Sequence, residues 1–154
     1  MGKRATALLA TAVLASLMLV GQAHAAPSDH ARPAASGKTA IPGEQATQVR
    51  YAPFTLSHNQ SVSSDTARLV MQSDGNLVIY DEFNRARWAS NTVGQGWTAR
   101  FQTDGNFVVY TRSNRAVWAS NTAGRPGSRL AIQDDGNVVI YDGSRAVWAS
   151  GTNH

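Results

Sequence analysis

QSDGNLVIY, the stretch from Gln72 to Tyr80, returns twice in this chain, as QTDGNFVVY and as QDDGNVVIY. The second copy begins at Gln102 and the third at Gln133, so the copies are spaced by 30 and 31 residues. Gln, Asp, Gly, Asn, Val and Tyr hold their places in all three copies, while the residues between them change. A tryptophan follows each copy, within RWASNT, VWASNT or VWASGT, at Trp88, Trp118 and Trp148. Three such units predict a closed, three-fold arrangement rather than a long solenoid.

Each unit is predicted to contain β-strands joined by tight turns. Asp-Gly between two strand-like runs is a strong hairpin signal, because glycine accepts a positive φ without steric cost. In the first unit we expect one strand at 69–72, a turn at 73–75 and a returning strand at 76–80. A second turn at 81–86 then leads to the Trp-Ala-Ser strand. No stretch of the mature chain shows helical periodicity with caps, so the predicted fold class is all-β.

The hairpin brings five repeated side chains of each unit onto one face. The period of two along a strand places Asn76, Val78 and Tyr80 on the face opposite the core. Gln72 lies across from Asn76, and Asp74 projects from the turn between them. A turn alone requires Asp-Gly, and a tyrosine can simply cap a core, but neither requirement explains the repeated glutamine. We therefore favour a shared ligand over the interpretation that the motif only preserves turns.

The chemistry of this face suits a sugar. An amide offers a donor and an acceptor, a carboxylate accepts and a phenol does either, so these groups match adjacent hydroxyls. The valine methyl groups would meet the C–H face of the ring. Each hydrogen bond contributes only about 1 kcal/mol net, because it replaces a bond to water. One shallow site is therefore weak, roughly millimolar, and three linked sites raise avidity by about 10² to 10⁴.

The pattern Q-x-D-x-N-x-V-x-Y, present three times with Trp-Ala-Ser after it, resembles the monocot mannose-binding lectins, also called bulb-type lectins. The resemblance covers residues 51–154. It implies a β-prism of three four-stranded antiparallel sheets with pseudo-three-fold symmetry, and calcium-independent mannose binding at one site per sheet, with no cofactor or metal. In that family Gln, Asp and Asn bind the axial 2-hydroxyl and its neighbour, Tyr reaches the 4-hydroxyl and Val packs on the ring. Carried over, the carbohydrate-binding residues are Gln72, Asp74, Asn76, Val78, Tyr80, Gln102, Asp104, Asn106, Val108, Tyr110, Gln133, Asp135, Asn137, Val139 and Tyr141.

The resemblance carries three further expectations. The repeated tryptophans correspond to residues that meet along the prism axis, so we interpret them as structural rather than as sugar-stacking. Plant members usually have a disulfide beside the first repeat, and Gly75 and Trp97 stand at the corresponding places here. Losing that crosslink costs about 2–4 kcal/mol unless the packing of Trp97 offsets it. Members also often exchange their C-terminal strand, so a homodimer formed by strand exchange is expected.

Residues 1–25 are predicted to be a secretory signal peptide. Lys3 and Arg4 precede the apolar run ALLATAVLASLMLV, and small residues flank the expected cleavage near Ala25. A membrane anchor would also begin with an apolar run, but this run is short for a span and no basic stop-transfer cluster follows it. Residues 26–50, dominated by Pro, Ala, Gly, Ser and charges, are predicted to be a flexible leader. The lectin domain of a secreted, extracellular protein is then 51–154.

Charge and cysteine content narrow the function classes. With Lys3 and Arg4 removed, 12 of the 14 basic residues remain against 10 acidic ones, a net charge near +2. This mild charge, carried by scattered arginines, argues against a nucleic-acid partner. The sequence has no cysteine, so thiolate chemistry and Cys-ligated metal sites are excluded, and a small domain in an oxidising compartment must rely on its core alone.

An enzyme is the first function that competes with a lectin. Glycoside hydrolysis needs two carboxyl groups about 5–9.5 Å apart, whereas each unit repeats only one. His58 and His154 lie outside the motifs, so no Ser-His-Asp arrangement is indicated. Two more functions are compatible with the same fold: a lectin-like antibacterial protein of the bacteriocin type, and a protein-interaction scaffold. The sequence predicts a lectin for mannose-type glycans on cell surfaces or polysaccharides, without catalysis or membrane insertion.

Overall fold

The computed structural model describes residues 46–154. The predicted signal peptide, 1–25, and residues 26–45 of the predicted leader lie outside the described residues. The described part contains twelve β-strands and no helix. It therefore holds no helix that is long and apolar enough to cross a membrane. The all-β fold class is confirmed.

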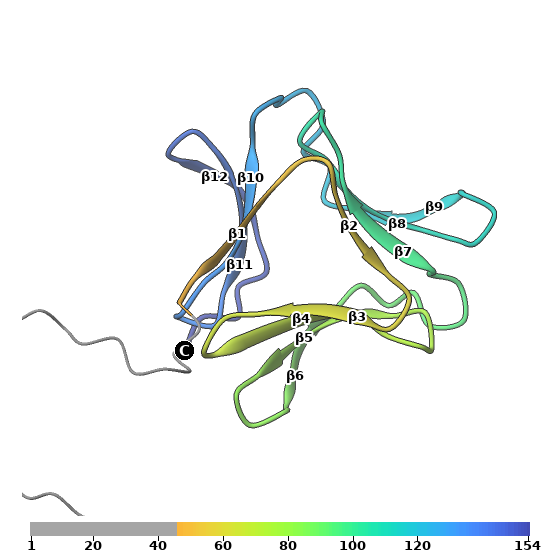
Figure 1. Ribbon diagram of the computed structural model, residues 1–154, viewed down its shortest axis with the longest axis horizontal. Helices are drawn as coiled ribbons and strands as arrows, with labels where there is room; N and C mark the ends of the chain where they lie inside the picture. Colours follow the sequence, from red (N-terminus) through yellow and green to blue (C-terminus); the bar gives the residue numbers. More distant parts are fainter. Residues whose placement is uncertain (1–45) are drawn as a thin grey trace, which may run out of the picture. The chain divides into compact units, whose positions relative to one another are not determined.

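The twelve strands form three four-stranded antiparallel sheets, each named here by the motif that it contains. The first-motif sheet has the order β3 (Gln60–Ser63), β4 (Ala67–Met71), β5 (Leu77–Asp81), β6 (Ala86–Ala89). The second-motif sheet has the order β2 (Phe54–Ser57), β7 (Thr98–Phe101), β8 (Phe107–Tyr110), β9 (Ala116–Ala119). The third-motif sheet has the order β1 (Gln48–Tyr51), β10 (Arg129–Ile132), β11 (Val138–Asp142), β12 (Arg145–Ala149). In Figure 1 the sheets form the three sides of a prism.

The first three strands of the described part run along the three sides in succession (Figure 1). β1 pairs with β10, β2 pairs with β7 and β3 pairs with β4. Each sheet therefore takes one edge strand from the segment 48–63 and its other three strands from one repeat. A repeat alone supplies a three-stranded meander, and the segment 48–63 completes all three sheets.

Residues 48–50, which the sequence analysis assigns to the leader, belong to β1 and so to the fold. Gln48 pairs with Ile132 and Arg50 with Leu130 in the register with β10. The strand shows no buried apolar alternation, because Val49 and Tyr51 face outward and are 36% and 65% exposed. Antiparallel pairing of the backbone with β10, rather than burial of side chains, defines this edge strand.

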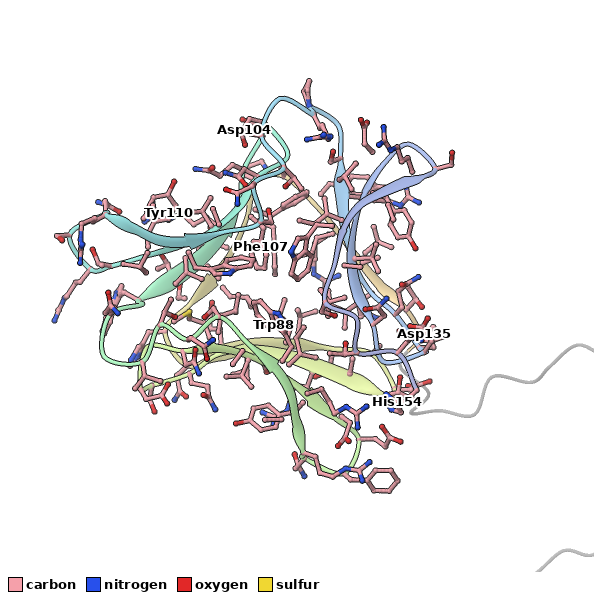
Figure 2. The ribbon with its side chains drawn as sticks, turned by 180° about the vertical axis from the view of Figure 1, so that it is seen from behind. Trp88, Asp104, Phe107, Tyr110, Asp135 and His154 are labelled. Atoms are coloured by element: carbon pink, nitrogen blue, oxygen red, sulfur yellow. The ribbon has the colours of Figure 1, made fainter. Side chains whose placement is uncertain are left out.

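The interior holds the inward-facing residues of the sheets, and three half-buried tryptophans pack against them. Leu77 and Ile79 alternate into the core and are fully buried, as the period of two predicts. Figure 2 shows Trp88 at the centre of the prism. It meets the other two tryptophans edge to face, and the three ring-centroid distances are 5.2, 5.6 and 5.8 Å. Aromatic pairs in this geometry stabilise beyond the area that they bury, so the position agrees with the structural role expected for Trp88, Trp118 and Trp148.

Two glycines allow the loop after β6 to lie directly against the first motif. A Cβ atom built on Gly96 would overlap the carbonyl oxygen of Gly75. Trp97 is engaged elsewhere: its ring stacks on His58 with centroids 4.1 Å apart, and it lies 4.8 Å from the guanidinium carbon of Arg112. The close approach to Gly75 is therefore made by Gly96, the residue before Trp97.

Candidate functional site

The outer face of each sheet carries one motif around the turn between its two central strands. In the first-motif sheet, Val70 lies opposite Val78 and Arg68 lies opposite Tyr80. The row continues across the turn, where the N–H of Gln72 donates to the carbonyl of Asn76 at 2.9 Å. The second and third motifs close their turns with the same backbone bond, at 2.8 and 2.9 Å. The structure thus brings the predicted Gln, Asn, Val and Tyr of each unit together on one face.

The glutamine and the tyrosine of each motif are hydrogen-bonded to each other. The Gln Nε2 donates to the Tyr Oη at 2.6, 2.7 and 3.2 Å in the first, second and third motifs. This bond gives the repeated glutamine a partner that the sequence analysis does not find, because the two residues are eight positions apart. The phenol keeps its own hydrogen for another acceptor. The pairs are Gln72–Tyr80, Gln102–Tyr110 and Gln133–Tyr141.

The motif aspartates are exposed and close their own turns. One carboxylate oxygen of each accepts the backbone N–H of the motif asparagine at 2.9 Å in all three units. This is the arrangement of an Asx-turn. No other hydrogen bond reaches these side chains from the residues that the structure describes, so the second oxygen is available to a ligand. Figure 2 shows Asp104 and Asp135 at different corners of the prism.

The motif asparagine is held by the loop that follows the tryptophan. Oδ1 of Asn76 accepts the N–H of Thr92 at 3.1 Å and the hydroxyl of Ser90 at 3.2 Å. Asn106 and Asn137 are held by the same two kinds of bond. The amide oxygen is therefore committed to the fold, and the Nδ2 group is the part that remains to donate to a ligand.

The serine and threonine after each tryptophan support the motif turn, a role that the sequence analysis does not assign. Ser90 Oγ accepts the N–H of Leu77 at 3.0 Å, and Thr92 Oγ1 donates to the carbonyl of Gly75 at 2.8 Å. The other two units repeat both bonds. The signal in the sequence is the shared Ser-x-Thr of RWASNT, VWASNT and VWASGT. The supporting pairs are Ser90 and Thr92, Ser120 and Thr122, and Ser150 and Thr152.

The motif valines form the floor of the outer face and are nearly covered. Val78, Val108 and Val139 are 3, 3 and 2% exposed. Val78 lies in register between Val70 and Ala89, whose side chains share its face. A ligand on this face could therefore touch only a small area of each valine. The polar groups at the rim would supply most of the contact with such a ligand.

An arginine stacks on the tyrosine of each motif. The guanidinium carbon lies 4.9, 4.9 and 4.7 Å from the ring centroid in the three units. The guanidinium also donates to the tip of the neighbouring hairpin, to Oδ1 of Asn84 at 3.2 Å, to Oδ1 of Asn114 at 2.9 Å and to the carbonyl of Gly143. These arginines are Arg68, Arg100 and Arg129, and they lie outside the repeated nine-residue motif.

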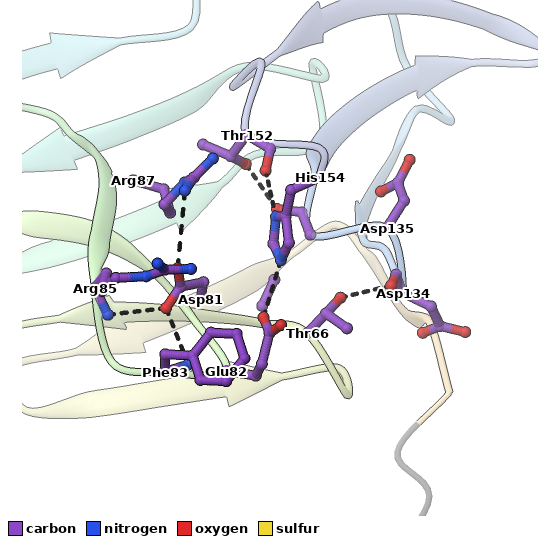
Figure 3. A network of polar contacts seen from close by, with 12 residues as sticks. Thr66, Asp81, Glu82, Phe83, Arg85, Arg87, Asp134, Asp135, Thr152 and His154 are labelled. Carbon is purple, nitrogen blue, oxygen red and sulfur yellow. Dashed lines mark hydrogen bonds and ion pairs between the residues drawn. The ribbon is translucent and has the colours of Figure 1, made fainter.

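His154 joins the third motif to the first-motif sheet (Figure 3). Its backbone N–H donates to the carbonyl of Asp135 at 2.9 Å, and its ring Nε2 lies 2.9 Å from Oε2 of Glu82. The hydrogen bond to the Thr152 carbonyl, and then the bond to Glu82, raise the pKa of His154 above its ordinary value. The same bond to His154 lowers the pKa of Glu82.

Comparison with known proteins identifies the family. No model of a protein family matches the chain, and a search of curated proteins finds no significant match. Among solved structures, the monomeric monocot mannose-binding lectins of Gastrodia elata are 43% identical to it. That match covers 71% of this chain and 99% of the other, with a TM-score of 0.62. The chain belongs to the bulb-type, or monocot mannose-binding, lectin family.

Two further structures resemble this bulb-type lectin. The mannose-specific agglutinin of snowdrop (Galanthus nivalis), solved with methyl α-D-mannoside, is 42% identical over 69% of this chain and 97% of its own, with a TM-score of 0.57. The lectin of Polygonatum cyrtonema, solved with a monomannoside, is 37% identical over 69% of this chain and 96% of its own, with a TM-score of 0.55. The predicted β-prism is confirmed by the three sheets and by these similarities.

Proposed function

We propose that this bulb-type lectin binds mannose-containing glycans on cell surfaces or polysaccharides, through up to three calcium-independent sites. The observation that carries the proposal is one ordered polar face that occurs three times, once on each sheet. The names of the similar structures, which describe mannose binding, support the choice of sugar. The proposed binding residues are the fifteen motif residues, the Gln, Asp, Asn, Val and Tyr of each unit.

The contacts within each site favour binding because they order the polar groups in advance. The Gln–Tyr bond, the Asx-turn, and the bonds from the loop serine and threonine to the asparagine oxygen together fix four of the five side chains before a ligand arrives. Fixing side chains in the free protein lowers the entropy cost of binding. The axial 2-hydroxyl expected to meet Asp and Asn also sets the preference, because a sugar without it leaves those groups unpaired.

Calorimetric titration with methyl α-mannoside and methyl α-glucoside tests the proposal. We expect roughly millimolar binding of the mannoside, much weaker binding of the 2-epimer, and no change when a chelator removes calcium. Asp104→Asn keeps the turn acceptor but removes the carboxylate, so it should lower the number of mannoside sites from three to two. Thr103→Ala, an exposed change in the same turn outside the motif, is the control. Equal site numbers in parent and D104N would contradict the assignment.

We propose that the protein binds glycans without altering them. The similar structures are lectins, and each unit repeats one carboxylate rather than two. Release of free sugar from mannan by the purified protein would overturn this part of the proposal. Growth inhibition of neighbouring bacteria would favour the bacteriocin-type role, and binding to proteins without any glycan signal would favour the scaffold.

Secretion and assembly are the remaining parts of the proposal. The signal-peptide pattern supports export, so mass spectrometry of the extracellular protein should find a chain that begins near Ala26. In a homodimer formed by strand exchange, β12 would leave β11 of its own chain, with which it pairs here, and join the partner. A single species of monomer mass in light scattering at micromolar concentration would argue against the dimer.

A further inference from the structure

The arginine that stacks on each motif tyrosine belongs to the same outer face as the proposed site. Arg68 lies directly opposite Tyr80, and Arg129 lies directly opposite Tyr141, so each pair ends the row that begins at the motif turn. The guanidinium carbons are less than 5 Å from the ring centroids. A ligand that reaches the phenol therefore comes close to the guanidinium as well.

The second unit reaches the same geometry from a different strand position. There the residue opposite Tyr110 is Thr98, and Arg100 lies opposite Val108, two residues further along the same face. Its guanidinium carbon nevertheless lies 4.9 Å from the Tyr110 ring centroid. The arginine thus occupies two different strand positions, yet its charge lies over the tyrosine ring in all three units. Repetition of the strand pairing alone does not explain this stacking. A positive charge beside the phenol is the feature that the three units share.

The three arginines keep most of their hydrogen-bonding capacity and all of their charge. A guanidinium has five N–H donors, and the bonds seen here lead only to the hairpin tips. The ion pairs among residues 46–154 involve Arg85, Arg87 and His154 instead. None of the three therefore has a carboxylate partner within the described part of the chain. Each residue is half-buried, but its guanidinium bonds lie at exposed positions, so the charge is accessible to a ligand and is screened by salt.

We propose that the three sites select mannose-type glycans that carry an acidic group, and that Arg68, Arg100 and Arg129 bind that group. The proposal rests on the mannose-binding function proposed above and adds a substrate class to it. A carboxylate or a phosphate accepts two parallel N–H bonds from one guanidinium, which a neutral hydroxyl cannot do. The motif aspartate lies at the opposite end of each face, beside the turn. The guanidinium and this carboxylate therefore lie at opposite ends of each face, and the acidic group belongs at the tyrosine end. In the first unit Asp65, Asp81 and Glu82 line the same hollow as Arg68, so the preference should be weakest there.

Titration with charged and neutral forms of one sugar tests the proposal. The probes are methyl α-mannoside, mannose 6-phosphate, mannose 1-phosphate and the C6 carboxylate methyl mannosiduronate. We expect at least one acidic probe to bind about tenfold more tightly than the neutral sugar, since a hydrogen bond to a charged group is worth more than a neutral one. The preference should shrink as salt is raised. The C1 and C6 phosphates should differ, because they cannot both lie beside the arginine; the carboxylate probe separates a uronate source from a phosphate ester.

Matched arginine variants separate a ligand contact from support of the tyrosine. R100Q/R129Q should lose the preference for the acidic probe at two of three sites while keeping neutral binding within about twofold. The control R115Q/R145Q removes the same amount of charge from two exposed positions, one in the hairpin between β8 and β9 and one at the start of β12. It should keep the preference for the acidic probe. Thermal unfolding monitored by circular dichroism reports whether each variant is folded.

The outcomes distinguish this proposal from the one on which it rests. A protein that binds neutral and acidic mannose equally, at low and high salt, retains the proposed function but overturns the acidic preference. Equal loss of neutral and acidic binding in R100Q/R129Q would also overturn it, because the arginines would then act only on the tyrosine. A protein that binds none of the probes contradicts both. The salt dependence of the parent protein decides the question even if a variant fails to fold.

Discussion

Single residues of the motif serve the fold and the proposed site with different atoms. The oxygen of the motif asparagine accepts two bonds from the loop after the tryptophan, whereas its Nδ2 group is left for a ligand. The motif aspartate likewise uses one oxygen for its turn. A substitution at the motif therefore affects stability and binding to different extents, depending on which atom it removes.

Asn106→Ala should lower both stability and binding at the second site. It removes the acceptor of the Thr122 N–H, and Thr122 is 1% exposed. A buried donor without a partner costs about 1–3 kcal/mol, so the free energy of unfolding should fall by that amount in urea denaturation. Asp104→Asn keeps its turn acceptor and should stay within about 0.5 kcal/mol of the parent. Equal stability of the two variants would refute the structural role of the asparagine oxygen.

The period of two predicts which motif residues share a face, but not how they contact one another. That period alone assigns Leu77 and Ile79 to the core and Val78 to the opposite face, and the structure agrees. It does not predict the Gln72–Tyr80 bond or the stacking of Arg68. Both depend on the register between strands, which is a tertiary property that a local pattern does not contain.

At the scale of elements, strands that carry the repeated motif are predictable from the sequence and edge strands are not. The turn expected at 73–75 lies between β4 and β5. The second turn, expected at 81–86, is observed at 82–85, because Asp81 ends β5 and Ala86 begins β6. By contrast β1, β2 and β3 are four residues each, carry no repeat and bury few side chains. Backbone hydrogen bonds to the repeats define these strands, so hydrophobic alternation in the sequence does not predict them.

Gly96→Ala should destabilise the contact between the first motif turn and the loop after β6. The added Cβ meets the backbone of Gly75 and the side chains of Met71 and Val109, so the loop must move. Overpacking of this kind costs about 1–3 kcal/mol. Gly143→Ala gives the cost of backbone strain alone, since its Cβ would meet nothing within 4 Å and only its φ of +57° disfavours alanine. A melting temperature for G96A that is no lower than that of G143A would contradict the steric argument.

The contact between His154 and Glu82 should make stability depend on pH. The pKa of His154 is raised, so its contribution is full below the unfolded value near 6.5 and is lost as pH rises through the folded pKa. The pKa of Glu82 is lowered, so its contribution is present above the unfolded value near 4.5 and is lost as pH falls through the folded pKa. The pair should therefore stabilise the folded state most between about pH 4.5 and 6.5.

Denaturation of H154Q and E82Q across this pH range checks the contact. Each single variant should remove the extra stability seen near pH 6 relative to pH 8, and the double variant should remove no more than either alone. Both groups are partly exposed, so the effect should decrease at high salt. Additive losses in the double variant would show that the two side chains act independently.

At the scale of the whole molecule, the three sheets share one interior, and the tryptophans are where they meet. Each sheet contributes one tryptophan, from β6, β9 or β12, and each ring contacts the other two. The three-fold arrangement predicted from the repeat is therefore realised as a mutual contact. The loss of one ring affects all three sheets.

Trp148→Ala should cost more stability than Trp97→Ala, although both remove the same side chain. Trp148 contacts both other central rings, so its loss should cost about 3 kcal/mol, the lower end of the range for large aromatic residues. Trp97 packs against His58 and Arg112, outside the central cluster, so its loss should cost about 1 kcal/mol. Urea denaturation followed by circular dichroism gives both values, and the reverse order would exclude the cluster as the main support of the fold.

The first three strands pair with the repeats in reverse order: β3 with the first repeat, β2 with the second and β1 with the third. During synthesis β3 can pair at once with β4, the next strand. β2 stays unpaired until β7, which begins at Thr98, has been synthesised, and β1 stays unpaired until β10, which begins at Arg129, has been synthesised. A chain that emerges with its N-terminus first can therefore close one side of the prism after each repeat, and each closure encloses a longer loop than the one before. At about 5–20 residues per second, successive closures are separated by a few seconds of translation. Synthesis and closure then proceed in the same direction, and the last side to close is the one that joins the earliest strand of the domain to the latest repeat.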